Sequence, residues 1–267
     1  MGGVFDNTLC SCGSGKKYKN CCMKKKMTYE RYQRMKYNVE DVPFDKAKIV
    51  IYSDNAIPLG VKLINENGNE IKTSLKEMQG LYRRENKPDK MLYTQPINDS
   101  FVINSNVELA KYDMLLVVDT SYDPYSNPKM AFTSVLTCLK EYETKNEYGY
   151  NIISHLLEWD LTRCSQVENY TYAYAIEFLR TKYKENNVIL KTAVIIDSCL
   201  GSILSYNEKK EAIFEDYYLP DGFFIFYASD KGDMLQNTLL KTCDSQAKEA
   251  LRQYKEEIAS KSHNCNI

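Results

Sequence analysis

The stretch YDMLLVVDTS, from Tyr112 to Ser121, decides the fold. It opens with a continuous apolar run of strand length, and the acid Asp119 stands where that run stops. Two prolines follow within the next nine residues, Ser121 to Lys129, which is typical of a turn. The sequence therefore predicts a strand over 112–119 that ends in a carboxylate.

Similar patterns extend outward on both sides of this strand. Downstream, the apolar spacing predicts strands at 130–139, 148–159, 188–197 and 222–227, and helices at 166–184 and about 233–260. The segment 148–159 also fits a helix, and a short helix or loop follows 197, so the predicted order is β-β-β-α-β-α-β-α. Upstream, we expect a helix at 27–39 and strands at 48–53, 60–65 and 70–73, with Asn67-Gly68 as a hairpin turn and a polar loop at 83–90.

Acidic residues recur where apolar strands stop. Asp197 ends the run AVIID, and Asp230 and Asp233 follow GFFIFYAS. When neighbouring strands of one sheet each end in a carboxylate, the acids converge at one sheet edge, and convergent carboxylates bind Mg²⁺ or Mn²⁺. The alternative is structural: such acids also turn the chain or cap the next element, and Asp233 fits the N-cap of the final helix.

The order of elements and acids over residues 110–262 resembles the ribonuclease H superfamily. The matching features are Asp119-Thr120-Ser121 on the first strand, a turn and hairpin, Glu168 in the helix after the third strand, Asp197-Ser198 after the fourth, and an acid at the start of the last helix. Glu177 lies too far along its helix to be the first choice for the second acid, and Asp230 is a weaker match than Asp233 for the last. The resemblance implies that Asp119, Glu168, Asp197 and Asp233 ligate Mg²⁺ or Mn²⁺ and catalyse phosphodiester hydrolysis.

Four cysteines stand close together near the N-terminus: Cys10, Cys12, Cys21 and Cys22. Thiolates at such short spacing can close a tetrahedral zinc shell, which would hold a segment with little core of its own. A site made only of cysteines is structural rather than catalytic. Reduced thiols or disulfides are the alternative, although adjacent cysteines do not readily bridge each other.

The segment LCSCGSGKKYKNCCM, residues 9–23, resembles the SEC-C motif, a short zinc-binding module found in many bacterial proteins. The resemblance extends to the glycines and to Lys16, Lys17 and Tyr18. It implies a bound zinc ion and docking on a protein or ribosomal partner. Six lysines and no acid lie between Cys12 and Met27. They would favour RNA or an acidic surface, or they form an ordinary solvated charge run.

Composition excludes several classes of function. The 267 residues carry a net charge of −1, so any nucleic-acid binding must come from local patches. Only His155 and His263 are present, so acid-base and metal chemistry must come from carboxylates. The first ten residues do not resemble a signal peptide, and no apolar run would span a membrane, so we expect a cytoplasmic location. The 22 tyrosines could form a surface on which nucleic-acid bases stack, or they could simply pack against the sheet and helices.

The sequence thus predicts a zinc module at 1–26, a helix with a strand-rich region at 27–109, and at 110–267 an α/β domain whose mixed sheet is flanked by helices. The leading functional hypothesis is a metal-dependent nuclease acting on RNA, DNA or a hybrid. The alternative is a non-enzymatic, zinc-dependent adaptor on the same scaffold. A third interpretation takes Asp54, at the end of KIVIYSD, as the first acid of the nuclease sheet.

Overall fold

The computed structural model describes residues 47–54, 57–71, 75, 82–85, 92–95, 100–125, 130–160, 165–229, 232 and 234–264. The four zinc-ligand candidates Cys10, Cys12, Cys21 and Cys22, the predicted helix at 27–39, Asp230 and Asp233 lie outside these residues. The elements are β1 (Lys48–Asp54), β2 (Ile57–Ile64), β3 (Glu70–Ile71), β4 (Tyr82–Glu85), β5 (Leu92–Gln95), α2 (Asn106–Leu109), β6 (Met114–Tyr122), β7 (Met130–Glu143), β8 (Glu147–Asp160), α3 (Val167–Glu185), β9 (Thr192–Ile196), α4 (Leu200–Asn207), β10 (Phe223–Tyr227) and α5 (Leu235–Asn264).

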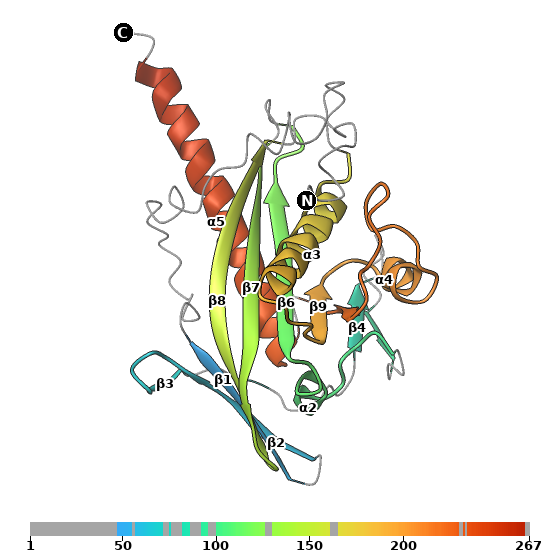
Figure 1. Ribbon diagram of the computed structural model, residues 1–267. Coiled ribbons are helices and arrows are strands. Elements are labelled where there is room, and N and C mark those ends of the chain that lie inside the picture. The colour runs from blue at the N-terminus through green and yellow to red at the C-terminus, as the bar shows by residue number, and fades with distance from the viewer. Residues whose placement is uncertain are drawn as a thin grey trace.

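The protein has a mixed α/β fold built on an eight-stranded sheet in the order β10-β9-β6-β7-β8-β1-β2-β3. β6 pairs in parallel with β9, and β9 with β10, whereas β6-β7-β8 form an antiparallel meander. The predicted order β-β-β-α-β-α-β-α is therefore confirmed over β6 to α5, and the segment 148–159 is a strand. α3 covers one face of the sheet and α5 crosses the other, extending past it toward the C-terminus (Figure 1).

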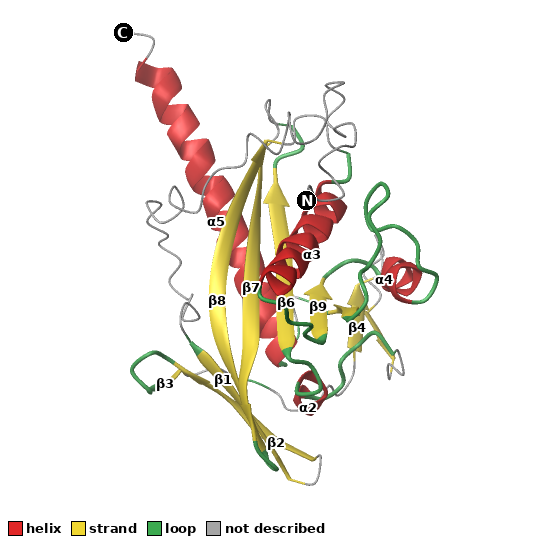
Figure 2. Ribbon diagram, in the orientation of Figure 1, coloured by secondary structure: helices red, strands yellow, loops and turns green. Residues whose placement is uncertain are grey.

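The two helices create two separate cores, because successive side chains of a strand point to opposite faces. On β6, Leu116 and Val118 pack toward α3, while Leu115 and Val117 pack toward α5. This double burial explains why β6 is a continuous apolar run rather than an alternating one. Helices on both sides of the central strands are seen in Figure 2.

The strand-rich region upstream of 110 joins the same sheet. β1 pairs antiparallel with both β2 and β8, so hydrogen bonds connect it directly to the C-terminal elements. Within the segment 83–90, expected to be a loop, residues 83–85 lie instead in β4, which pairs only with β5. Four residues are within the usual range of strand lengths.

Asp54 does not lie near the other strand-end acids. β1 ends beside Glu147, the first residue of β8, whereas Asp119 is level with Leu156 of β8 through their shared pairing with β7. Along β8, the interval from 147 to 156 spans roughly 30 Å. The interpretation that takes Asp54 as the first acid of a nuclease site is therefore wrong.

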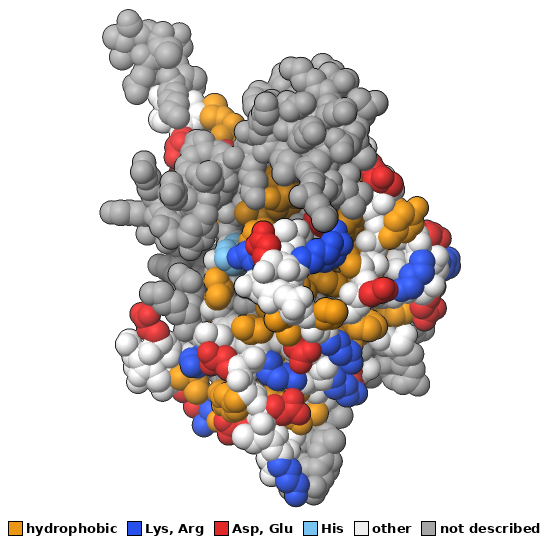
Figure 3. Space-filling view, in the orientation of Figure 1, with side chains coloured by type: hydrophobic (Ala, Val, Ile, Leu, Met, Phe, Trp, Pro, Cys, Tyr) orange, Lys and Arg blue, Asp and Glu red, His pale blue; other side chains and the backbone are white. Residues whose placement is uncertain are grey.

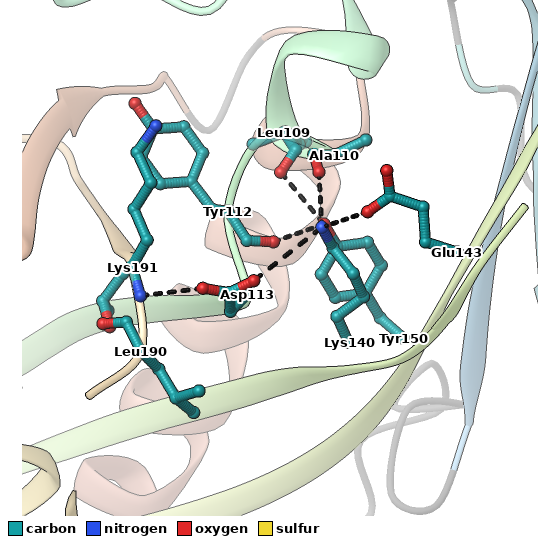
Figure 4. A network of polar contacts seen from close by, with 10 residues as sticks. Leu109, Ala110, Tyr112, Asp113, Lys140, Glu143, Tyr150, Leu190 and Lys191 are labelled. Atoms are coloured by element: carbon teal, nitrogen blue, oxygen red, sulfur yellow. Dashed lines mark hydrogen bonds and ion pairs between the residues drawn. The ribbon is translucent and has the colours of Figure 1, made fainter. Parts of the chain in front are cut away.

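A buried polar network fixes α2 against the start of β6 (Figure 4). The hydroxyl of Tyr150, on β8, donates to the carbonyl oxygens of Leu109 and Tyr112 at 3.0 and 2.8 Å. The ammonium of Lys140, on β7, donates to the carbonyl of Ala110 at 2.7 Å. These contacts join the C-terminal end of α2 and the residues that follow it to β7 and β8.

The edge strand β10 is held by side-chain and loop contacts. Asn207, the last residue of α4, accepts from the amide of Ile225 at 2.9 Å and donates to its carbonyl at 2.7 Å. The amide of Tyr227 donates to the carbonyl of Phe101 at 2.8 Å, beside the isolated bridge between Val102 and Tyr227. One asparagine thus takes the place of a neighbouring strand at the centre of β10.

The visible surface carries both signs of charge. Lysine and arginine side chains lie among aspartate and glutamate side chains on the face shown in Figure 3, in keeping with the net charge of −1. None of the helices in the described ranges is both long and apolar enough to cross a membrane.

Candidate functional site

Asp119 and Asp197 stand at the same level just beyond the parallel pairing of β6 and β9, and β6 itself continues to Tyr122 rather than ending at Asp119 as predicted. The registered pair Val117–Ile195 joins β6 and β9 in parallel, and each acid lies two residues beyond its member of that pair. Asp119 is 8% exposed, whereas Asp197 is exposed just beyond β9. The parallel pairing of these strands therefore brings together two acids that are far apart in the sequence.

Burial, followed by the negative charges of Asp197 and Asp244, raises the pKa of Asp119 to about 8. A hydrogen bond from the amide of Thr120 at 2.9 Å acts in the opposite direction and limits this rise. A carboxyl group in an apolar setting beside like charges favours the neutral form. In the absence of a cation, the folded protein therefore holds a proton on this group at neutral pH.

Asp244, on α5, is a site residue that sequence reasoning missed. Its negative charge raises the pKa of Asp119, and its Oδ2 lies 2.6 Å from the ammonium of Lys248. The sequence of α5 did contain a sign of this role. Asp244 stands within a stripe of three apolar residues that are buried in the structure: Leu240, Cys243 and Ala247. An acid among core-facing positions must have a polar partner in the sheet.

Glu168 lies in the first turn of α3, where the resemblance predicted the second acid. Its pKa is raised by burial and then by the charge of Asp197. Glu177 is engaged elsewhere: both of its carboxylate oxygens accept from Arg180 at 2.6 Å, and Oε2 also accepts from Tyr217 at 3.3 Å. The first turn of α3, rather than its middle, therefore lies near Asp197.

Tyr172 links the acids, and it too was missed from the sequence. Its hydroxyl donates to Oδ1 of Asp197 at 2.9 Å. Its pKa is raised well above the ordinary value by burial, and then by the charges of Asp197, Glu168 and Asp119. One buried phenol is thus within electrostatic reach of three of the four predicted acids. We define Asp119, Glu168, Asp197 and Asp244 as the acidic cluster.

A network of hydroxyl groups supports the cluster from the α3 side. Thr120 shares hydrogen bonds with Thr133 at 2.9 Å and with Thr171 at 2.7 Å. The indole of Trp159 donates to Thr133 at 3.0 Å, and Thr171 donates to the carbonyl of Glu168 at 2.8 Å. The network ties the first turn of α3 to the ends of β6, β7 and β8, and so fixes Glu168 relative to Asp119.

The donor atoms of the cluster are all carboxylate oxygens, which suit Mg²⁺ or Mn²⁺ rather than a soft metal. Within the described part of the chain, however, no group of three or more His, Cys, Asp or Glu side chains is arranged to hold a metal ion. The predicted fourth acid, Asp233, lies outside that part. The donor chemistry therefore fits such an ion, while the side chains would have to draw closer together to bind it.

Comparison with known proteins identifies one short segment. Residues 7–24 match the SEC-C motif. The predicted resemblance at the N-terminus is thereby confirmed, whereas nothing in the comparisons extends to the α/β body. No curated protein and no solved structure matches the chain.

Proposed function

We propose that this protein is a divalent-metal-dependent nuclease with a ribonuclease H-like body and a zinc-binding docking module. The observation that carries the proposal is the position of buried Asp119 near Asp197 and Asp244, just beyond the point where two parallel strands stop pairing. The order β-β-β-α-β-α-β-α, with its antiparallel meander followed by two parallel strands, supports the same proposal.

In this proposal Asp119, Glu168 and Asp197 hold Mg²⁺ or Mn²⁺, and Asp244 takes part beside or instead of Asp233. A bound divalent ion would supply a water activated for attack on a phosphodiester. Asp119 would release its proton to bind the ion, because cations and protons compete for the same oxygens. Tyr172 is a positioning residue, since its hydrogen bond fixes one oxygen of Asp197.

The test combines thermal unfolding with cleavage assays. Mg²⁺ or Mn²⁺ should raise the melting temperature of the wild type and support cleavage of labelled RNA, DNA or RNA/DNA hybrid. Asp197→Asn should remove both effects, whereas Asp221→Asn, an exposed acid in the turn before β10, should keep both. If metal neither stabilises the wild type nor supports cleavage of any of the three substrates, the proposal that this protein is a nuclease is rejected.

The second candidate is a non-enzymatic adaptor. The match of residues 7–24 to the SEC-C motif favours it, since such modules bind zinc and dock on protein or ribosomal partners. Here Cys10, Cys12, Cys21 and Cys22 hold zinc, and the acidic cluster serves only structure. A zinc-dependent complex with a partner, together with no metal response of the acidic cluster, would favour this candidate.

A further inference from the structure

A pocket of about 420 Å³ lies along the outer side of β10. Its walls come from three segments that are distant in the sequence: 100–112, the end of α4 at 207–210, and β10 itself. No acid of the acidic cluster is among its lining residues, and Phe224 pairs with Ala193, four positions before Asp197, which is roughly 13 Å along the strand.

Aromatic rings form one wall of this β10 pocket. Tyr112 packs edge-on against Phe224 and Phe226, with ring centroids 6.0 and 5.4 Å apart. Phe224 remains 42% exposed although it belongs to a sheet strand. A large exposed ring at the rim of a pocket offers a flat apolar surface to a planar ligand.

Lysines surround the rings. The ammonium of Lys191 lies 4.8 Å from the ring centroid of Tyr112 and 5.7 Å from that of Phe224, and Figure 4 shows its side chain beside Tyr112. Lys111 and Lys210 line the pocket and are exposed. Lys210 adopts a left-handed backbone conformation, with φ of 55°, which is uncommon outside glycine and recurs at ligand sites.

The rim is not uniformly basic. Glu108 and Glu208 also line the pocket, and Glu108 accepts a hydrogen bond from the amide of Asn104 at 3.3 Å. Two lysines and two glutamates line the pocket, and Lys191 adds a positive charge beside the aromatic wall. The site thus suits a ligand with one flat apolar part and one anionic part.

We propose that the β10 pocket binds one nucleotide unit, with its base stacked on Phe224 and its phosphate held by Lys191 and neighbouring lysines. The pocket volume is within the range of small-ligand sites. Aromatic rings stack on any base, and lysines bind phosphate without regard to sequence. A base inside a duplex has both faces covered by its neighbours, so the unit is a free nucleotide or part of a single strand.

This binding site goes beyond the proposed hydrolysis and does not depend on it. Its test is fluorescence anisotropy with labelled single strands of about ten nucleotides, in buffer without Mg²⁺ or Mn²⁺, so that cleavage cannot contribute. Phe224→Ala should weaken binding about tenfold, and Phe224→Trp should retain it. Tyr218→Ala, an aromatic side chain that is 55% exposed elsewhere, should leave affinity unchanged.

Charge is tested separately. Lys191→Gln should reduce the slope of log affinity against log salt concentration by about one, whereas Lys241→Gln, on the exposed side of α5, should not. In Phe224→Trp, the added indole should lose fluorescence when a base stacks on it, against the constant signal of buried Trp159. This readout tests the stacking contact even if Phe224→Ala fails to fold.

Competition identifies the source of the nucleotide. Displacement of the strand by nucleoside monophosphates at similar concentration would indicate a free nucleotide as the natural occupant, while weak displacement would indicate a strand. Equal affinity of wild type and Phe224→Ala, or equal binding of the matching duplex, would overturn the proposal. It also fails if polyglutamate displaces the strand as well as another strand does, because an acidic protein surface would then be the better ligand.

Discussion

Asp119 on β6 and Asp244 on α5 bring two acidic side chains together across the interface between strand and helix, where the charge of Asp244 raises the pKa of Asp119. Burial, together with the negative charges of Asp197 and Asp244, raises the pKa of Asp119 to about 8, because an apolar setting beside like charges favours the neutral form. In the metal-free protein, the end of the central strand therefore holds a proton that an ordinary surface aspartate would have lost.

The first prediction concerns pH. The pKa of Asp119 is raised from 3.8 to about 8 on folding, so its protonated form stabilises the fold fully below pH 4. That contribution should be lost as the pH rises from about 4 to 8. Without metal, the melting temperature of the wild type should fall over this interval relative to that of Asp119→Asn, which cannot ionise. Parallel pH profiles for the two proteins would contradict this.

A second prediction concerns the hydroxyl network. Thr133→Val leaves the indole N–H of Trp159 without its acceptor in a fully buried site, so the free energy of unfolding should fall by about 1–3 kcal/mol. Urea denaturation measures the change. Thr137→Val is the matched control on the same strand, because its hydroxyl makes only a long 3.4 Å contact. An equal decrease in the free energy of unfolding in both variants would mean that the hydroxyl network adds no more stability than the long contact of Thr137.

The third prediction concerns the edge strand. Asn207→Ala removes both partners of the Ile225 backbone and should lower the free energy of unfolding by about 1–2 kcal/mol. Hydrogen exchange should show faster exchange of the Ile225 amide. Asn207→Asp, which keeps the acceptor and loses the donor, should protect that amide better than alanine does. Asn186→Ala, whose side chain makes an exposed contact at the end of α3, should leave the Ile225 amide unchanged.

The fourth prediction concerns zinc. The purified protein should contain about one zinc ion per chain, and Cys21→Ser with Cys22→Ser should lose it, because the match to the SEC-C motif includes these positions. Elemental analysis measures the metal, and circular dichroism should show that the α/β body stays folded. Cys199→Ser, at an exposed cysteine outside the motif, serves as the control. Undiminished zinc in the double variant would remove these cysteines from the site.

Local patterns predicted most of the α/β body because its elements are long and regular. The apolar run of β6 and the spacing of α3 each identify one element without help from distant residues. The pairing of β1 with β8 could not be predicted in this way, because neither strand specifies its partner by local pattern. The role of Asp244 depends on which face of α5 meets β6, and only the packed structure decides that.

The ends of the sheet also bear on how copies of this chain behave at high concentration. Three amides of β10 point away from β9, and all three are already used within the chain. They belong to Phe223, Ile225 and Tyr227, and their acceptors are the carbonyl of Pro220, the side chain of Asn207 and the carbonyl of Phe101. At the other end, β3 has only two residues, one of them Glu70. It covers only Leu63 and Ile64 of β2. In the described part of the sheet it is therefore the β10 end that disfavours addition of a strand from a second copy, because these three amides are already bonded within the chain.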